Sequence, residues 1–348
     1  MLVELIDVDD RRWSDALSLI PHDFYHLPSY ARVEARHDGA QALALHGINE
    51  DGVVFLVPLL MRRLPSQLGL PESWRDATAP YGYPAPISTA TSPDTFNKFM
   101  RRSVQVAREN DIISLFLRWH PLLMPNLRNP IDGETVVEHG KTVFVDLSES
   151  ADEWQRQTRK DHRYRIRQLR KLGFDFAIDR ADMLPDFHRI YLATMQRVAA
   201  HSSYGYSIEY FLDLQESLGN CFHVASVISP QGDIAASGIF TECCGIVQYH
   251  LSGSAQEYMH LSPMRLLLDE VRSWAKERGN RIFHLGGGLG GTDDSLFDFK
   301  AAFSKYRSPF HTSRIITDIQ SYDEAVLANR KRDVALQDNY FPAYRQAA

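Results

Sequence analysis

The sequence contains little cysteine and no long apolar run. Its 348 residues include three cysteines, Cys221, Cys243 and Cys244, and the last two are neighbours. This spacing fits neither a disulfide framework nor a zinc site, and the fourteen histidines are scattered along the chain. No stretch reaches the roughly 18 consecutive apolar residues of a membrane-spanning helix, and the amino terminus lacks the pattern of a secretory signal. We therefore expect a cytoplasmic protein with no bound metal ion and no resident cofactor.

Positive charge is also scarce, except in one segment. Lys and Arg number 38 against 44 Asp and Glu, which gives a net charge of −6. Eight of the basic residues and one Asp lie at positions 156–171, so this segment carries +7 and the remainder carries −13. Such a distribution excludes general coating of nucleic acid, which needs a broadly basic face, but it permits one anionic partner to dock at one place.

The length and the order of predicted elements indicate two α/β (α+β) domains, over residues 1–148 and 149–348. Helix and strand patterns alternate in the first half. In the second half, three successive strand patterns at 222–229, 233–242 and 245–253 precede a long helix at 263–278 and a strand at 281–285. We expect each domain to contain a mixed, mostly antiparallel sheet flanked by helices.

A glycine-rich loop joins this last strand to a helix. Five of the six residues at 286–291 are glycine, so the backbone there can approach a ligand closely. Gly286, Gly287 and Gly288 are therefore candidate binding residues, and a tight corner without ligand contact is the alternative. A dinucleotide site is excluded, because too little chain follows the loop to complete a doubly wound sheet.

Lys300 follows this loop on the predicted helix. If the helix begins near Thr292, then Leu296, Phe299 and Phe303 share one apolar stripe and Lys300 lies beside that buried face. Its ammonium group is therefore a candidate functional group. A lysine whose apolar stem packs while its charge reaches solvent is the alternative.

Motifs along nearly the whole chain resemble one known family, the FemABX aminoacyltransferases and their GNAT-like relatives. They are HDFYHLPSY, VPLLMRRLP and DATAPYGYPAP in the first half, and YLATMQR, YHLSGS, SPMRLLLDEVRSWAKERG, DSLFDFK and FSKYR in the second. The resemblance implies two fused GNAT-like domains. It also implies transfer of an amino acid from aminoacyl-tRNA to an amine on a peptidoglycan precursor or a small biosynthetic amine. In the family pattern the Phe-Lys pair lies at the active cleft, which maps to Phe299 and Lys300.

Two departures from known patterns concern the donor. The chain has no room for the coiled-coil arm with which some members bind tRNA. It also lacks the glycine-containing diphosphate loop of acyl-CoA enzymes, because the corresponding segment reads YMHLSPMRLLL and Pro263 removes an amide donor. We therefore expect aminoacyl-tRNA as the co-substrate, with acyl-CoA as the alternative.

The basic segment offers a matching anion site on the predicted helix 152–172. Tyr164, Ile166, Leu169 and Leu172 are expected to form its packed side. Arginine side chains suit bidentate phosphate binding, so the opposite stripe is interpreted as a site for a tRNA backbone or a nucleotide diphosphate. A solvated surface helix is the alternative. The stripe comprises Lys160, Arg163, Arg167, Arg170 and Lys171.

Further candidates concern proton transfer and substrate binding. Asp76 is nominated as the base that deprotonates the acceptor amine, with Lys300 and the loop amides stabilising the oxyanion. No nucleophile–histidine spacing indicates a covalent intermediate, so direct transfer is the simplest mechanism. A binding module without catalytic activity is a further alternative. The additional candidate substrate-binding residues are Tyr81, Tyr83, Tyr191, Arg197, Tyr249 and Ser252.

Overall fold

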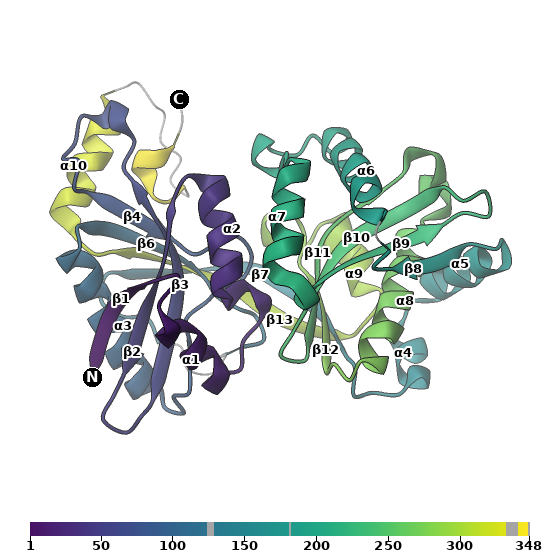
Figure 1. Ribbon diagram of the computed structural model, residues 1–348, viewed down its shortest axis with the longest axis horizontal. Helices are drawn as coiled ribbons and strands as arrows, with labels where there is room; N and C mark the ends of the chain where they lie inside the picture. Colours follow the sequence, from purple (N-terminus) through teal and green to yellow (C-terminus); the bar gives the residue numbers. More distant parts are fainter. Residues whose placement is uncertain (124–128, 181, 332–339, 347–348) are drawn as a thin grey trace. The chain divides into compact units, whose positions relative to one another are not determined.

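The computed structural model describes residues 1–123, 129–180, 182–331 and 340–346 and divides into two compact units (Figure 1). The first unit comprises Met1–His139 and Phe310–Ala348, and the second comprises Gly140–Pro309. The expected division at residue 148 differs from this in two ways. The chain leaves the first unit within a long strand, and its last segment returns to the first unit because residues 312–316 pair with that unit's sheet.

The first unit is built on a mostly antiparallel sheet. Its strands follow the order β1-β2-β3-β4-β6-β13, and β5 pairs with β3. Among the described strands of this unit, β4 and β6 run parallel and the other pairs are antiparallel, which agrees with the mixed sheet expected from the sequence. The strands are β1 (Leu2–Asp7), β2 (Gln41–Ile48), β3 (Val54–Arg63), β4 (Arg75–Thr78), β5 (Ile87–Ser88), β6 (Ile112–Arg118) and β13 (Tyr306–Ile316).

Helices cover both faces of this sheet, because alternate residues of its strands are apolar on each face. Val57 and Leu59 of β3 share a cluster with Phe99 of α3, while Leu56 and Leu60 pack with α1 and α2. The carboxy-terminal α10 packs beside β6. The helices are α1 (Arg11–Leu19), α2 (Pro28–Asp38), α3 (Pro93–Glu109) and α10 (Ile319–Arg330).

The second unit contains a sheet of the order β7-β12-β11-β10-β9-β8. Strands β9 to β11 form the antiparallel meander that the three successive strand patterns predict; β8 pairs antiparallel with β9, and β12 lies parallel to β11. The strands are β7 (Glu134–Asp146), β8 (Asp175–Ile178), β9 (Phe222–Ile228), β10 (Ile234–Cys243), β11 (Ile246–Ser254) and β12 (Ile282–Gly286).

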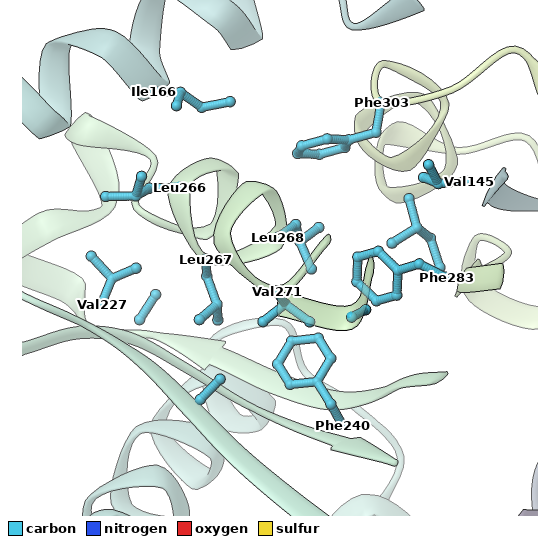
Figure 2. Packing of buried hydrophobic residues seen from close by; sticks show 14 of the residues in the cluster. Val145, Ile166, Val227, Phe240, Leu266, Leu267, Leu268, Val271, Phe283 and Phe303 are labelled. Atoms are coloured by element: carbon cyan, nitrogen blue, oxygen red, sulfur yellow. The ribbon is translucent and has the colours of Figure 1, made fainter. Parts of the chain in front are cut away.

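The long helix α8 fills the core on one face of this sheet. Figure 2 shows Leu267 and Val271 of α8 directed towards Phe240 of the sheet, with Ile166 of α5 on the other side of the helix. Helices α6 and α7 contact β9. The helices are α4 (Ala151–Gln157), α5 (Lys160–Lys171), α6 (Met183–Arg197), α7 (Ile208–Leu218), α8 (Met264–Glu277) and α9 (Ser295–Ala301).

The single helix predicted at 152–172 is wrong, because it is broken into α4 and α5. Thr158 is extended, and its hydroxyl donates to Trp154 O of the preceding turn at 2.7 Å. The next amide, that of Arg159, donates to Ala302 O at 2.8 Å instead of continuing the helix. The break therefore fixes the start of α5 against the end of α9. Within the described ranges, no helix has the length and apolarity to cross a membrane.

Candidate active site

Strands β11 and β12 run side by side for a short distance only. Their parallel pairing ends at Gln248 and His284, whose buried side chains are joined by a 2.8 Å hydrogen bond. Beyond this point β11 continues along β10 with a bulge at His250, since Phe240 pairs with Tyr249 and Ile239 with Leu251. A bulge redirects the side chains of its strand and is common beside active sites. The sequence analysis did not nominate Gln248 and His284.

The glycine loop follows β12 as a closely packed corner. Gly286 has a φ of +74°, which favours glycine. A Cβ at Gly287 would approach Lys141 O to 2.9 Å, and one at Gly288 would collide with Thr292 O and the Asp294 carboxylate. Packing therefore requires glycine at positions 287 and 288, and a ligand-binding role of Gly286, Gly287 and Gly288 stays a prediction.

Asp294 fastens this loop to α9. Its Oδ1 accepts the Phe297 amide at 2.8 Å as the N-cap of α9, and its Oδ2 accepts the Leu289 amide at 2.9 Å. The predicted start near Thr292 is therefore wrong by about one turn. Because the Leu289 amide is already bonded, this group of the loop is not available to an oxyanion.

Lys300 lies on the buried face of α9 together with Phe297, whereas Leu296 and Phe299 of the predicted apolar stripe are half-buried. Its side chain is 8 % exposed, and Nζ donates to Gly287 O at 2.7 Å. Nζ also lies 5.4 Å from the centre of the Tyr249 ring, a cation–π distance. Burial lowers the pKa of Lys300 to about 8, and the negative charge of Asp294 opposes this fall. The ammonium group therefore does not reach bulk solvent, contrary to the snorkelling alternative.

Tyr249 and Ser252 stand beside this ammonium group on β11. The Tyr249 ring stacks on Phe240 at 5.6 Å, and its hydroxyl is hydrogen-bonded to Ser252 Oγ. Burial raises the pKa of Tyr249 to about 12, while the bond to Ser252 acts against this rise. The phenol is therefore protonated at neutral pH. The structure thus brings four predicted residues together: Lys300, Tyr249, Ser252 and Gly287.

Phe299 faces the start of α5 and not Tyr249. Its ring lies 5.3 Å from that of His162, and Phe299 O lies 3.2 Å from His162 Nε2. Burial lowers the pKa of His162. His162 was missed by the sequence analysis, although it shares the buried spacing of Ile166 and Leu169 on α5. Phe299 therefore anchors α9 to α5 next to Lys300.

Tyr191 and Arg197 of α6 have packing partners of their own. Tyr191 is fully buried, and its hydroxyl donates to Tyr204 O at 2.8 Å. Arg197 donates to Thr194 Oγ1 at 3.1 Å and to Ser254 O at 3.3 Å, which ties α6 to the end of β11. Their roles in substrate binding stay predictions.

Asp76 lies in the first unit as a buried acceptor. Its carboxylate is paired with Arg62 at 2.9 Å and with Arg345, and it accepts the Tyr344 hydroxyl at 3.2 Å. These contacts fasten the carboxy-terminal segment to β4. They occupy the lone pairs that a general base would use, so we do not carry Asp76 into the mechanism.

Tyr81 and Tyr83 also lie in the first unit. The Tyr81 carbonyl accepts the Tyr30 hydroxyl at 3.0 Å, and the Tyr83 ring lies 5.1 Å from Phe310 in an edge-to-face arrangement. Both rings are half-buried. These contacts suit the packing alternative, and ligand binding by either tyrosine stays a prediction.

The basic stripe on α5 divides into paired and exposed residues. Arg170 forms ion pairs with Asp269 at 2.9 Å and Glu270 at 2.7 Å, and Arg163 donates to Gln155 O at 2.8 Å. Within the described part of the chain, no ion-pair partner is found for the exposed members Lys160, Arg167 and Lys171.

Two residues expected on the packed side of α5 are exposed instead. Tyr164 is 58 % and Leu172 48 % exposed, because the buried stripe is formed by His162, Ile166 and Leu169. Tyr164 therefore lies on the side of α5 opposite this stripe, together with Lys160, Arg167 and Lys171. An exposed aromatic ring between cations suits contact with a nucleic acid.

Comparison with known proteins agrees with this architecture. Residues 156–300 match the model of the acetyltransferase (GNAT) domain. A crystal structure of FemX superposes with a TM-score of 0.66 at 13 % identity and covers 88 % of this chain and 96 % of FemX. Curated proteins give no match.

Lysylphosphatidylglycerol synthetases have a similar fold. The structure of L-PGS from Bacillus licheniformis gives a TM-score of 0.57 at 13 % identity and covers 92 % of this chain and 96 % of that one. The C-terminal domain of a putative lysylphosphatidylglycerol synthetase from Agrobacterium fabrum gives 0.54 at 16 % identity, with 87 % and 90 % covered. At these identities the likeness is one of fold. The predicted resemblance is confirmed at the level of the fold, which the chain shares with FemX, and residues 156–300 match the acetyltransferase (GNAT) domain.

Proposed function

We propose that the chain is an aminoacyl-tRNA-dependent N-aminoacyltransferase, which forms an amide bond on an amine-bearing acceptor such as a peptidoglycan precursor or a small biosynthetic amine. The observation that carries the proposal is the environment of Lys300. Its ammonium group is buried, and among the described residues no carboxylate lies within ion-pair distance of it. Burying a cation without a counter-ion raises the free energy of the folded protein. A negative charge that develops beside it during the reaction is therefore strongly stabilised.

The mechanism is a direct transfer. The acceptor amine attacks the ester carbonyl of the donor, and the resulting oxyanion is stabilised by Lys300, one of whose protons is already held by Gly287 O. The new C–N bond forms, the ester C–O bond breaks, and the tRNA hydroxyl leaves with the proton that the amine releases. The Tyr249 ring lies against the Lys300 ammonium group, and its protonated hydroxyl is held by Ser252.

The start of α8 bears on the nature of the donor. The amides of Arg265 and Leu266 already donate to the carbonyl groups of Ser262 and Pro263 at 3.1 and 3.0 Å. The backbone there therefore offers little for a CoA diphosphate, whose binding in GNAT enzymes uses free amides. The resemblance to FemABX enzymes and the fold shared with lysylphosphatidylglycerol synthetases also favour an aminoacyl group.

Acyl-CoA is the second candidate donor, because the matching domain model is that of acetyltransferases. The two donors are distinguished by ribonuclease. The purified protein is incubated with an amine acceptor and a pool of charged tRNA. In a separate reaction it is incubated with the same acceptor and acetyl-CoA. We expect amide formation that ribonuclease abolishes and fresh charged tRNA restores. Transfer from acetyl-CoA that survives ribonuclease would replace the proposal by the second candidate, and binding without turnover would leave a non-catalytic module.

A further inference from the structure

Two arginines pair with one carboxylate where α5 meets α8, and the positive charge of a third arginine acts on one of them. Asp161 Oδ1 lies 3.2 Å from Arg159 Nε, and Asp161 Oδ2 lies 3.5 Å from Arg265 Nη2. Arg165 follows on the next turn of α5, where its guanidinium donates to Gln168. We call Arg159, Arg165 and Arg265 the arginine cluster. With Asp161 it carries a net charge of +2, all within the second unit.

Arg265 is the incompletely satisfied member of the arginine cluster. Its Nε is buried and has no hydrogen-bond partner among the residues that the structure describes. Its side chain is 18 % exposed. Burial lowers the pKa of this guanidinium, and the positive charges of Arg165 and Arg159 lower it further, while Asp161 opposes them. Like charges held together at a half-buried site are stabilised when an anion binds between them.

We propose that the arginine cluster binds a phosphate group of the donor substrate through its side chains. The planar guanidinium groups suit the bidentate geometry of phosphate oxygens. The same chemistry could be supplied by the backbone of the tRNA end or by the diphosphate of CoA. The existence of the site is independent of the proposed function, whereas the choice of the donor as its ligand rests on that function.

The arginine cluster is connected to the helix that carries Lys300. The Arg159 amide donates to Ala302 O at 2.8 Å, just beyond α9. His162, beside Asp161, lies with its Nε2 3.2 Å from Phe299 O and with its Nδ1 3.3 Å from the Asp161 carboxylate. A phosphate bound by the cluster is therefore positioned relative to α9 by two contacts at the carboxy-terminal end of this helix.

The site is tested with inorganic pyrophosphate as the probe, by calorimetry on the full chain. Loss of a charge-assisted hydrogen bond weakens binding by about 10- to 100-fold, which is the effect we expect for Arg265→Gln. Arg189→Gln is the matched control, because Arg189 is an exposed α6 residue of the same unit, paired with Asp186. Asp161→Asn removes the competing carboxylate and is expected to tighten binding several-fold.

Arg265→Gln is expected to weaken pyrophosphate binding and Asp161→Asn to tighten it. A folding defect would weaken binding in both variants and so would not give this pattern. Equal pyrophosphate affinity of the Arg265→Gln and Arg189→Gln variants would overturn the site, as would weaker binding by Asp161→Asn. Arg265→Lys keeps the charge and should restore part of the affinity.

Competition identifies the source of the phosphate. We add either CoA or an RNA minihelix ending in a single-stranded 3′ end, and displacement of pyrophosphate by one of them supports that donor. Displacement by neither would overturn the assignment to the donor. The ribonuclease assay scores the proposed function separately, since transfer from charged tRNA can persist when the arginine cluster binds nothing.

Discussion

Replacing Lys300 with methionine removes the buried charge while nearly keeping the volume of the side chain. In the folded protein the pKa of Lys300 falls from its ordinary 10.5 to about 8. The unfolded chain therefore holds this proton at higher pH than the folded chain. Below about pH 8 Lys300 is charged in both states, and the desolvation of this charge lowers the stability of the folded state by its full amount. This penalty disappears as the pH rises to about 10.5. A pKa difference of this size corresponds to about 3 kcal/mol.

We expect this difference in urea unfolding of the two proteins between pH 7 and 10.5. The stability of the wild type relative to Lys300→Met should rise by about 3 kcal/mol across this range. At pH 7 the variant should be as stable as the wild type or more stable, because the desolvation penalty that it removes is at least as large as the roughly 1.5–3 kcal/mol of the lost charge-assisted bond to Gly287 O. A pH-independent difference between the two proteins would show that Lys300 is not held as a desolvated cation.

Further predictions concern the loop, the first unit and the basic helix. Gly288→Ala places a methyl group against Asp294, so it should lower the free energy of unfolding by about 2 kcal/mol in urea titrations; unchanged stability would contradict the packed corner. Asp76→Asn should cost about 3 kcal/mol without changing the turnover of the folded protein. A tenfold loss of turnover would return Asp76 to the mechanism. Arg167→Gln should weaken tRNA binding and reduce its salt dependence in filter assays, whereas Arg170→Gln, which removes an ion-paired residue, should reduce stability more than affinity. Equal effects of the two substitutions on tRNA affinity would contradict the division of the basic stripe into ion-paired residues and residues available to tRNA.

The second unit could be predicted well from the sequence, because its signals are local. The short apolar runs of β9 to β11, bounded by turn residues, and the long apolar periodicity of α8 each determine one element without reference to the rest of the chain. The placement of Lys300 also follows from the spacing of its neighbours on one helix. The resemblance added the importance of the Phe299–Lys300 pair, which periodicity alone does not indicate.

The parts that were missed depend on contacts between distant segments. Strand β13 was not predicted, because its polar sequence becomes a strand by pairing with β6, nearly two hundred residues earlier. The break between α4 and α5 depends on the carbonyl of Ala302, and the ion pairs that occupy Asp76 involve Arg345 at the other end of the chain. None of these partners can be read from a local pattern.

The arginine cluster was also missed, for a related reason. Two of its members, Arg159 and Arg165, lie within the basic segment, where charge counting does not distinguish them from solvated neighbours. The third, Arg265, comes from α8, and only the packing of α8 against α5 brings it to Asp161.

The most direct test of the account is the turnover of the Lys300→Met variant with saturating charged tRNA and an amine acceptor. If the buried ammonium group stabilises the oxyanion, turnover should fall by about 10²- to 10³-fold while the melting temperature at pH 7 stays the same or rises. Wild-type turnover by the correctly folded variant would contradict the assignment of Lys300 to the chemistry.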